Sequence, residues 1–323
     1  MSLFKSIFIF VIVPLCNTIV SAQEAPNAKI SNGIVVANLY LPDKDDGFYR
    51  STRFDWSGVI YKLEYKGHDY FGQWFDDYDP EKHDAICGPV DEFGVVGYEG
   101  TKVGNSFLKI GVGMLKKHVE EPYNSFTYYN IENSGKRSYH KTRNTIEFKH
   151  MLTDSSGYAY EYTKTIKLTD GKPELVVSHY LKNTGILKIE TTVYNHNFFM
   201  IDQQKIGPEM IIRFPFKLIG DGLGIGEFAE LEGNEIKFLK PLEKADKVFV
   251  RNLKGFNETV DDHSFSIENH RTGAGVNLKA DKPLEHLVFW SCNTTSCPEP
   301  YIKIKLAPMD EFSWENTYEF YTF

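Results

Sequence analysis

The sequence lacks several features that mark common protein classes. Its one long apolar run, residues 7–15, is shorter than the about 20 apolar residues that a membrane-spanning helix needs. Its 323 residues carry 36 basic and 44 acidic side chains, for a formal net charge of −8, and no run of like charges. A moderately acidic surface disfavours binding to nucleic acid and to anionic membranes. We therefore expect no membrane span and no nucleic-acid partner.

The short apolar run has the features of an export signal. Lys5 precedes it, and Val20 and Ala22 occupy the −3 and −1 positions of a cleavage site before Gln23. The residues before Cys16 lack the small side chains of a lipoprotein signal. We therefore expect residues 1–22 to be a signal peptide, and residues 23–323 to form an exported protein, periplasmic or secreted.

Cysteines are few, and only Cys87, Cys292 and Cys297 follow the predicted signal peptide. In an oxidising compartment, Cys292 and Cys297 of "CNTTSC" are predicted to close a small disulfide loop. Cys87 is then expected to be a buried free thiol. No histidine lies at ligand spacing from the pair, which argues against a metal site.

Helical periodicity is scarce, no fixed-period repeat is visible, and no Pro/Ser linker divides the chain. Alternation of apolar and polar residues between Gly, Asn, Asp and Pro turn residues instead predicts many strands. Such strands predict an all-β domain over residues 23–323, a sandwich of large antiparallel sheets. The clearest strand segments are residues 57–71, 144–152, 158–168, 173–183, 188–199, 208–218 and 247–253.

Aromatic residues are abundant, at 15% of the chain, and they interrupt many strands together with Arg and His. A sandwich of curved sheets has a concave face, and aromatic side chains with polar rims suit sugar rings. The other interpretation is that tyrosines and tryptophans serve as amphipathic surface and core residues. The pattern is compatible with both.

The stretch "HYLKNTGILKIETTVYNHNFF" resembles the galactose mutarotase-like (aldose 1-epimerase) superfamily. Its members have a strand, an Asn-Thr-Gly turn, and a strand that ends in a histidine followed by any residue and two aromatics. Here the turn is Asn183-Thr184-Gly185, and the ending is His196-Asn197-Phe198-Phe199. The resemblance implies a β-supersandwich with a concave ligand-binding face.

Two further segments resemble the same superfamily. "GFYRSTRFDWSGVIYKLEYKGHDY" corresponds to its early arginine-bearing segment, so Arg53 is the counterpart of the sugar-contacting arginine. "IKIKLAPMDEFSWENTYEFYTF" corresponds to the closing strands around a proline turn, here Pro308-Met309-Asp310. The resemblance thus covers most of the chain after residue 22, in order.

The sequence also departs from the family pattern. The usual Leu-His-Gly-Gly segment is replaced by "HDAICGPVDEFG", in which His83, Asp91 and Glu92 are the candidate substrate-binding residues. The strand that should carry the catalytic glutamate has no carboxylate in its apolar middle. Glu299, in Pro-Glu-Pro, is the nearest candidate, and the adjacent Glu285 and His286 are the alternatives.

Ring opening and closure of a sugar needs one group to protonate the ring oxygen and another to accept the anomeric hydroxyl proton. The resemblance implies His196 as general acid and Glu299 as base. Each positioned acid or base of this kind typically accelerates a reaction by about 10²–10⁴-fold. The alternatives are a core histidine bonded to a backbone carbonyl and a solvated loop carboxylate. The alternative for Arg53 is a salt bridge to Asp55 or to another acid at a strand end.

Trp74 and Asn197 are the remaining candidates for substrate contact, Trp74 because it sits in the polar segment "GQWFDDYD". The chemistry requires no cofactor. The sequence therefore predicts an exported aldose 1-epimerase-like enzyme acting on a sugar or oligosaccharide. Two alternatives stay open: a non-catalytic carbohydrate-binding protein, and a polysaccharide lyase or hydrolase on a related sandwich.

Overall fold

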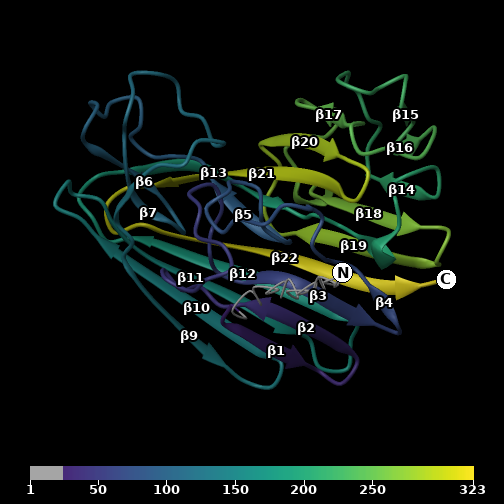
Figure 1. Cartoon of the computed structure of the whole chain (residues 1–323), viewed down its shortest axis with the longest axis horizontal. Helices are drawn as coiled ribbons and strands as arrows, with labels where there is room; N and C mark the ends of the chain where they lie inside the picture. The colour runs from purple at the N-terminus through teal and green to yellow at the C-terminus, as the bar shows by residue number, and fades with distance from the viewer. Residues whose placement is uncertain (1–24) are drawn as a thin grey trace, which may run out of the picture.

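The structure is a computed structural model that describes residues 25–323, and the predicted signal peptide lies outside the described residues. Over this range the chain forms 22 β-strands and two short 3-10 helices, η1 (Ile201–Gln203) and η2 (Val260–Asp262). The strands assemble into four antiparallel sheets (Figure 1). The predicted all-β fold class is confirmed, and each of the seven predicted segments contains a strand.

The largest sheet has ten strands and runs from β15 at one edge to β9 at the other. Burial alternates along several of its strands, as in β12, where every second side chain is buried. In order across the sheet, its strands are β15 (Ala229–Glu232), β16 (Glu235–Phe238), β14 (Met210–Arg213), β18 (Ser264–Asn269), β19 (Ala274–Ala280), β22 (Glu311–Thr322), β12 (Glu174–Asn183), β11 (Ala159–Leu168), β10 (Thr145–Thr153) and β9 (Lys136–Lys141).

A five-stranded sheet packs one face on the ten-stranded sheet. Phe93, Val193 and Ile302 of the smaller sheet belong to the same buried cluster as Tyr162 and Trp314 of the larger one. The opposite face of the five-stranded sheet is turned away from this core. Its strands, in order, are β17 (Val248–Val250), β20 (His286–Ser291), β21 (Ser296–Leu306), β13 (Ile189–His196) and β5 (Val90–Phe93).

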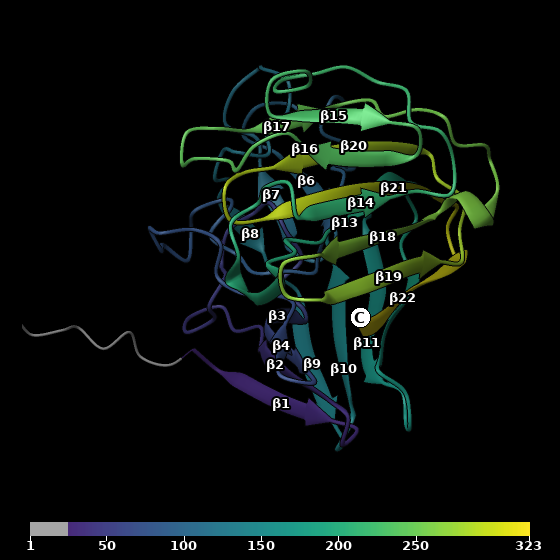
Figure 2. The same cartoon turned by 90° about the vertical axis from the view of Figure 1, so that its right-hand side faces the viewer.

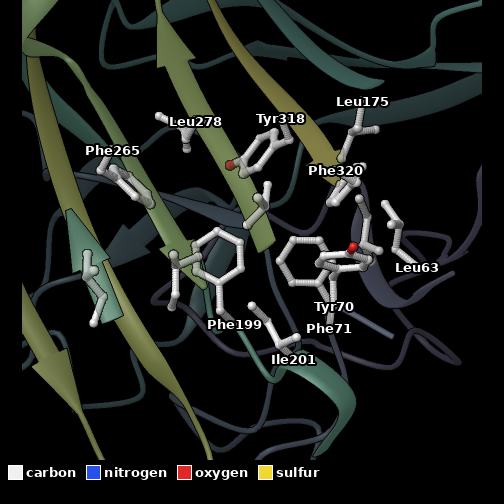
Figure 3. Close-up of a cluster of buried hydrophobic side chains, with 14 of the residues drawn as sticks. Leu63, Tyr70, Phe71, Leu175, Phe199, Ile201, Phe265, Leu278, Tyr318 and Phe320 are labelled. Carbon is white, nitrogen blue, oxygen red and sulfur yellow. The ribbon is translucent and has the colours of Figure 1, made fainter. Parts of the chain in front are cut away.

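Two smaller sheets complete the described fold, and Figure 2 shows β1 at the opposite end of the molecule from β15 and β17. The four-stranded sheet packs on the ten-stranded one, where Leu63 of β3 joins Leu175, Phe320, Tyr70 and Phe199 in a buried apolar cluster (Figure 3). The strands are β1 (Asn27–Ser31), β2 (Val35–Tyr40), β3 (Val59–Tyr65) and β4 (His68–Asp69), and, in the three-stranded sheet, β6 (Ser106–Lys109), β7 (Gly113–Lys116) and β8 (Ile131–Asn133).

The Asn-Thr-Gly turn carries the chain from β12 in the large sheet to β13 in the five-stranded sheet. The buried Asn183 side chain donates to the carbonyl oxygens of Leu187 (2.8 Å) and Leu306 (3.2 Å) and accepts from the Gly185 amide (3.0 Å). A Cβ on Gly185 would lie 2.5 Å from the carbonyl oxygen of Gly157, so glycine is required there. This turn fixes the start of β13, whose last residue is His196.

Candidate functional site

A cavity of about 710 Å³ lies on the face of the five-stranded sheet that is turned away from the ten-stranded sheet. Strands of that sheet and several connecting loops supply its walls. The lining residues are Arg53, Trp74, His83, Asp84, Glu92, Ser125, Phe126, Tyr194, His196, Phe198, Lys247, Phe249, Arg251, His286, Val288, Trp290, Glu299 and Tyr301.

Strand alternation explains which side chains reach this cavity. Tyr194 and His196 of β13 lie two residues apart, as do Glu299 and Tyr301 of β21. Successive side chains of a strand point to opposite faces, so each pair shares the cavity face. Tyr194 pairs with Tyr301 in the antiparallel register, and continuing that register by two residues brings His196 opposite Glu299.

His196 and Glu299 are in direct contact. Nε2 of His196 lies 3.3 Å from Oε1 of Glu299, and both side chains are more than nine-tenths buried. Glu299 belongs to β21 rather than to a surface turn, so the loop alternative for it is wrong. The backbone ladder between β13 and β21 ends at Tyr194 and Tyr301, next to Pro300, because proline has no amide to donate.

Aromatic rings, rather than a backbone carbonyl, orient the imidazole of His196. The ring of Phe198 stacks on it with centroids 3.7 Å apart and an interplanar angle of 8°. Phe54 and Trp290 present their edges at 5.6 and 5.8 Å. Nδ1 of His196 has no hydrogen-bond partner among the described protein groups. The core-histidine interpretation, which required a carbonyl partner, is therefore wrong.

Phe198 adopts a left-handed backbone conformation with φ of 44°. This conformation is costly for an aromatic residue, and strain of this kind concentrates at functional sites. Phe198 also stacks on Trp74, with ring centroids 5.2 Å apart and 11° between the planes. One apolar wall thus runs from Trp74 through Phe198 to the imidazole of His196.

Burial in this wall shifts the proton affinities of the contacting pair. Burial raises the pKa of Glu299 to about 8; the nearby Arg53 opposes the shift and Glu92 adds to it. Burial, reinforced by the charge of Arg53, holds the pKa of His196 well below its usual value. Both shifts favour a neutral imidazole beside a protonated carboxyl over an ion pair of His196 and Glu299.

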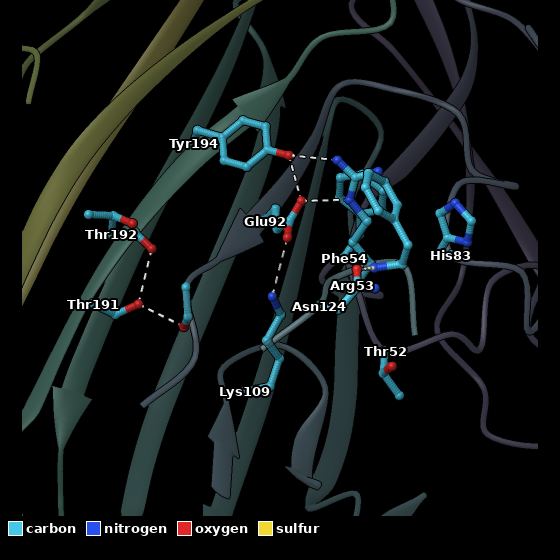
Figure 4. A network of polar contacts seen from close by, with 12 residues as sticks. Thr52, Arg53, Phe54, His83, Glu92, Lys109, Asn124, Thr191, Thr192 and Tyr194 are labelled. Carbon is cyan, nitrogen blue, oxygen red and sulfur yellow. Dashed lines mark hydrogen bonds and ion pairs between the residues drawn. The ribbon is translucent and has the colours of Figure 1, made fainter. Parts of the chain in front are cut away.

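Arg53, Glu92 and Tyr194 also line the cavity, and they form a network of polar contacts (Figure 4). Nε of Arg53 lies 2.7 Å from Oε2 of Glu92, and its Nη2 donates to the hydroxyl of Tyr194 at 3.0 Å. The Tyr194 hydroxyl donates to the same Glu92 oxygen at 2.5 Å, and Lys109 lies 3.5 Å from the other. Burial alone would raise the pKa of Glu92, but the charges of Arg53 and Lys109 hold it below its usual value. The alternative expected for Arg53, a salt bridge to Asp55 or another acid at a strand end, is therefore met by Glu92 of β5 rather than by Asp55, and Arg53 lines the cavity as well.

Asp91 does not line the cavity, contrary to the sequence-based prediction. It precedes Glu92 on β5, so its side chain points to the opposite face, between the two sheets. There its carboxylate lies 2.7 Å from Nζ of Lys164 and 3.0 Å from Nε2 of His179. Burial opposes ionisation, but these partners hold the pKa of Asp91 well below its usual range.

Asn197 is also a structural residue rather than a cavity residue. Its amide donates to the carbonyl oxygen of Pro298 at 2.8 Å, and its side-chain oxygen accepts from the hydroxyl of Tyr318 at 2.8 Å. It is completely buried. These bonds tie the end of β13 to β21 and β22, which holds the adjacent His196 in place.

The structure brings His83 and Trp74 to the rim of the cavity. His83 is half-buried, its Nε2 lies 3.4 Å from Asp84, and the ring of Phe126 packs against it. The indole of Trp74 donates to the carbonyl oxygen of Ile86 at 3.0 Å. Of the two alternatives to Glu299, His286 lines the cavity, whereas Glu285 is exposed and pairs with Lys303.

The predicted disulfide is wrong, because Cys292 and Cys297 are free thiols in the structure. Cys297 pairs with Trp290 across the hairpin, and Cys292 lies opposite Thr295. The two cysteines are therefore diagonal neighbours, a position with Cα atoms about 7–8 Å apart, beyond the usual reach of a disulfide. Cys87 is a buried free thiol, as predicted.

Sequence reasoning missed several residues of the cavity. Tyr194 and Tyr301 could have been found by stepping two residues from His196 and Glu299. Phe126 comes from a loop, and Lys247 and Arg251 flank β17, so only the fold brings them to the site. Within residues 25–323, no three His, Cys, Asp or Glu side chains are grouped as a metal site would require. The same range contains no helix long and apolar enough to cross a membrane.

Comparison with known proteins identifies the fold. No sequence-family model and no curated protein matches the chain. Solved structures do match: a galactose mutarotase-like protein from Clostridium acetobutylicum has a TM-score of 0.57 at 12% identity, covering 92% of this chain and 95% of its own. An aldose epimerase homologue from C. elegans has a TM-score of 0.55 at 12% identity, with 92% and 99% covered. A galactose mutarotase-like protein from Lactobacillus casei has a TM-score of 0.54 at 13% identity, with 91% and 100% covered.

Each of these structural matches covers nearly the whole length of both compared chains. The chain therefore has the galactose mutarotase-like fold, which is the fold that the resemblance implied. At such low identity the comparisons establish the fold, and the activity has to be argued from the site.

Proposed function

We propose that this protein is an exported aldose 1-epimerase-like enzyme that interconverts the anomers of a sugar, with residues 23–323 acting as one domain. The single observation that carries the proposal is the buried contact of 3.3 Å between His196 and Glu299 in the wall of the cavity. The two form an acid–base pair on a face rich in aromatic side chains, the kind of surface that suits a sugar ring.

The adjacency of the pair fits the chemistry of ring opening. The ring oxygen and the anomeric hydroxyl are bonded to the same carbon, so a group that protonates one and a group that deprotonates the other can act from neighbouring positions. A pair that holds one proton supplies both functions at once. The sequence-based roles, His196 as acid and Glu299 as base, require that proton to cross to the imidazole when sugar binds.

The neighbouring residues are proposed to hold the sugar. Arg53 uses two of its five N–H groups on Glu92 and Tyr194, which leaves donors for hydroxyl groups. Trp74 and Phe198 provide an apolar surface for one face of the ring. Glu92 and His83 are placed to accept or donate further hydrogen bonds from the same cavity.

The proposal is tested by following anomer interconversion with polarimetry or NMR for a panel of pure aldose anomers. His196→Ala and Glu299→Gln are each expected to lower kcat/KM by about 10²–10⁴-fold, because each removes one proton-transfer group. The matched controls are His140→Ala on β9 and Glu230→Gln on β15, both exposed and outside the cavity.

Equal rates for the wild type and both cavity variants on every sugar would contradict the proposal. Sugar-dependent thermal stabilisation without turnover would support the non-catalytic binding protein instead. Release of unsaturated or reducing ends from a polysaccharide would support the lyase or hydrolase.

A further inference from the structure

Two cationic side chains lie in the cavity without acidic partners. Lys247 and Arg251 flank β17 and line the cavity together with Phe249, while Val248 and Val250 between them are completely buried on the other face. Among the described residues, no ion pair joins Lys247 or Arg251 to a carboxylate. Both side chains are exposed to solvent from the cavity side of the strand.

Of the other charged groups in the cavity, Arg53 pairs with Glu92. Burial lowers the pKa of His83, so His83 does not neutralise the adjacent Asp84, whose carboxylate offsets one of the two cations. Lys247 and Arg251 therefore give this cavity a local positive charge in a protein whose formal net charge is −8. An acidic protein as a whole repels anions, so attraction of an anion must come from such local, focused cations.

The position of these cations relative to the acid–base pair is set by the sheet. β17 pairs with β20, and β20 pairs with β21, which carries Glu299. Neighbouring strands lie about 4.8 Å apart, so β17 is about 10 Å from the strand of Glu299. A sugar whose anomeric carbon lies at the pair would direct a remote substituent, or the next residue of an oligosaccharide, toward Lys247 and Arg251.

We propose that the substrate carries an anionic group, a phosphate, a sulfate or a carboxylate, remote from its anomeric carbon, and that Lys247 and Arg251 bind this group. The inference rests on the proposed function and narrows its substrate class. Arginine and lysine both bind such oxyanions through charge-assisted hydrogen bonds.

The test compares D-glucose with glucose 6-phosphate, glucose 6-sulfate and glucuronate, using NMR exchange rates between the anomers of each. At least one anionic sugar is expected to exceed glucose in kcat/KM by about 10- to 100-fold, as expected for one charge-assisted contact. The anionic sugar that is preferred identifies the group. In the double variant Lys247→Gln/Arg251→Gln, the ratio of anionic to neutral kcat/KM is expected to fall toward one.

The matched control is Lys279→Gln/Arg143→Gln, which removes the same two charges from exposed positions outside the cavity and should leave the ratio unchanged. A wild-type ratio of one or less for all three anionic sugars would overturn the inference while leaving the proposed function intact. If no sugar is turned over, thermal stabilisation by the anionic sugars separates the two ideas. If the anionic sugars stabilise the wild type but not the Lys247→Gln/Arg251→Gln variant, the anion site is supported. If glucose stabilises the wild type as much as the anionic sugars do, the inference is overturned.

Discussion

At the scale of a single residue, Glu299 couples the cavity to pH. Burial raises its pKa in the folded protein to about 8, from 4.5 in an exposed setting. The folded state therefore holds a proton that the unfolded state releases between these two values. The contribution of this extra proton to the unfolding free energy is fully present below about pH 4.5, and it is lost as the pH rises toward about 8.

The variant Glu299→Gln is neutral at every pH and tests this coupling. The unfolding free energy of the wild type relative to the variant is expected to fall by a few kcal/mol between about pH 5 and pH 9. The measurement is urea denaturation across that range. The wild-type kcat/KM should fall above about pH 8, where the pair loses its shared proton. A pH-independent difference in stability would mean that Glu299 ionises normally.

At the scale of elements, the sequence predicts the strands well, but it predicts poorly which face of the sheet each side chain occupies. Alternation located β10 to β13 because their apolar residues recur at every second position. A shift of one residue in register exchanges the two faces of a strand. All four residues of β5 are buried, so its sequence has no apolar–polar alternation that would show which side chains face the cavity. The sequence therefore predicts Asp91 in the cavity with Glu92, although only Glu92 lies there.

Two further features of the site could not be read from the sequence. Pro298 and Pro300 on either side of Glu299 are typical of a turn, yet they lie within β21, where the ladder to β13 has ended. Lys247 and Arg251, which flank β17, line the same cavity as Glu299 only because strands distant in the chain pair with one another. His196 and Arg53 can be predicted as site residues because each lies within a local sequence motif.

The junction of β5 and β13 gives a prediction at this scale. A Cβ on Gly88 would lie 2.6 Å from the carbonyl oxygen of Asn197 and 2.8 Å from that of His196. Gly88→Ala should therefore displace the end of β13 and destabilise the protein by about 1–3 kcal/mol. Because the imidazole moves with its backbone, kcat should fall by up to about 10²-fold in the folded variant.

Gly100→Ala is the control for this substitution, since the nearest atom to its added Cβ is 3.9 Å away. Thermal denaturation and the anomer-exchange assay are measured on both variants. Wild-type stability and kcat in Gly88→Ala would show that the strand junction tolerates the methyl group and does not position His196.

At the scale of the whole molecule, a buried ionic cluster joins the two principal sheets. Asp91 of β5 contacts Lys164 of β11 and His179 of β12, and Lys164 also lies 3.8 Å from Asp55. All four side chains are almost fully buried. Removing one partner of such a cluster leaves another charge unpaired in an apolar setting, which is more costly than removing both.

Asp91→Asn is accordingly expected to lower the unfolding free energy by about 3–5 kcal/mol, because Lys164 loses its closest partner. Urea denaturation of Asp91→Asn, Lys164→Met and the double variant should show strong non-additivity. The control is Asp170→Asn, which breaks an exposed pair with Arg143 and should cost less than about 1 kcal/mol. Since the Asp91 carboxylate faces away from the cavity, the folded Asp91→Asn protein should keep its KM for sugar. A raised KM in a variant of wild-type stability would instead show that Asp91 contributes to substrate binding.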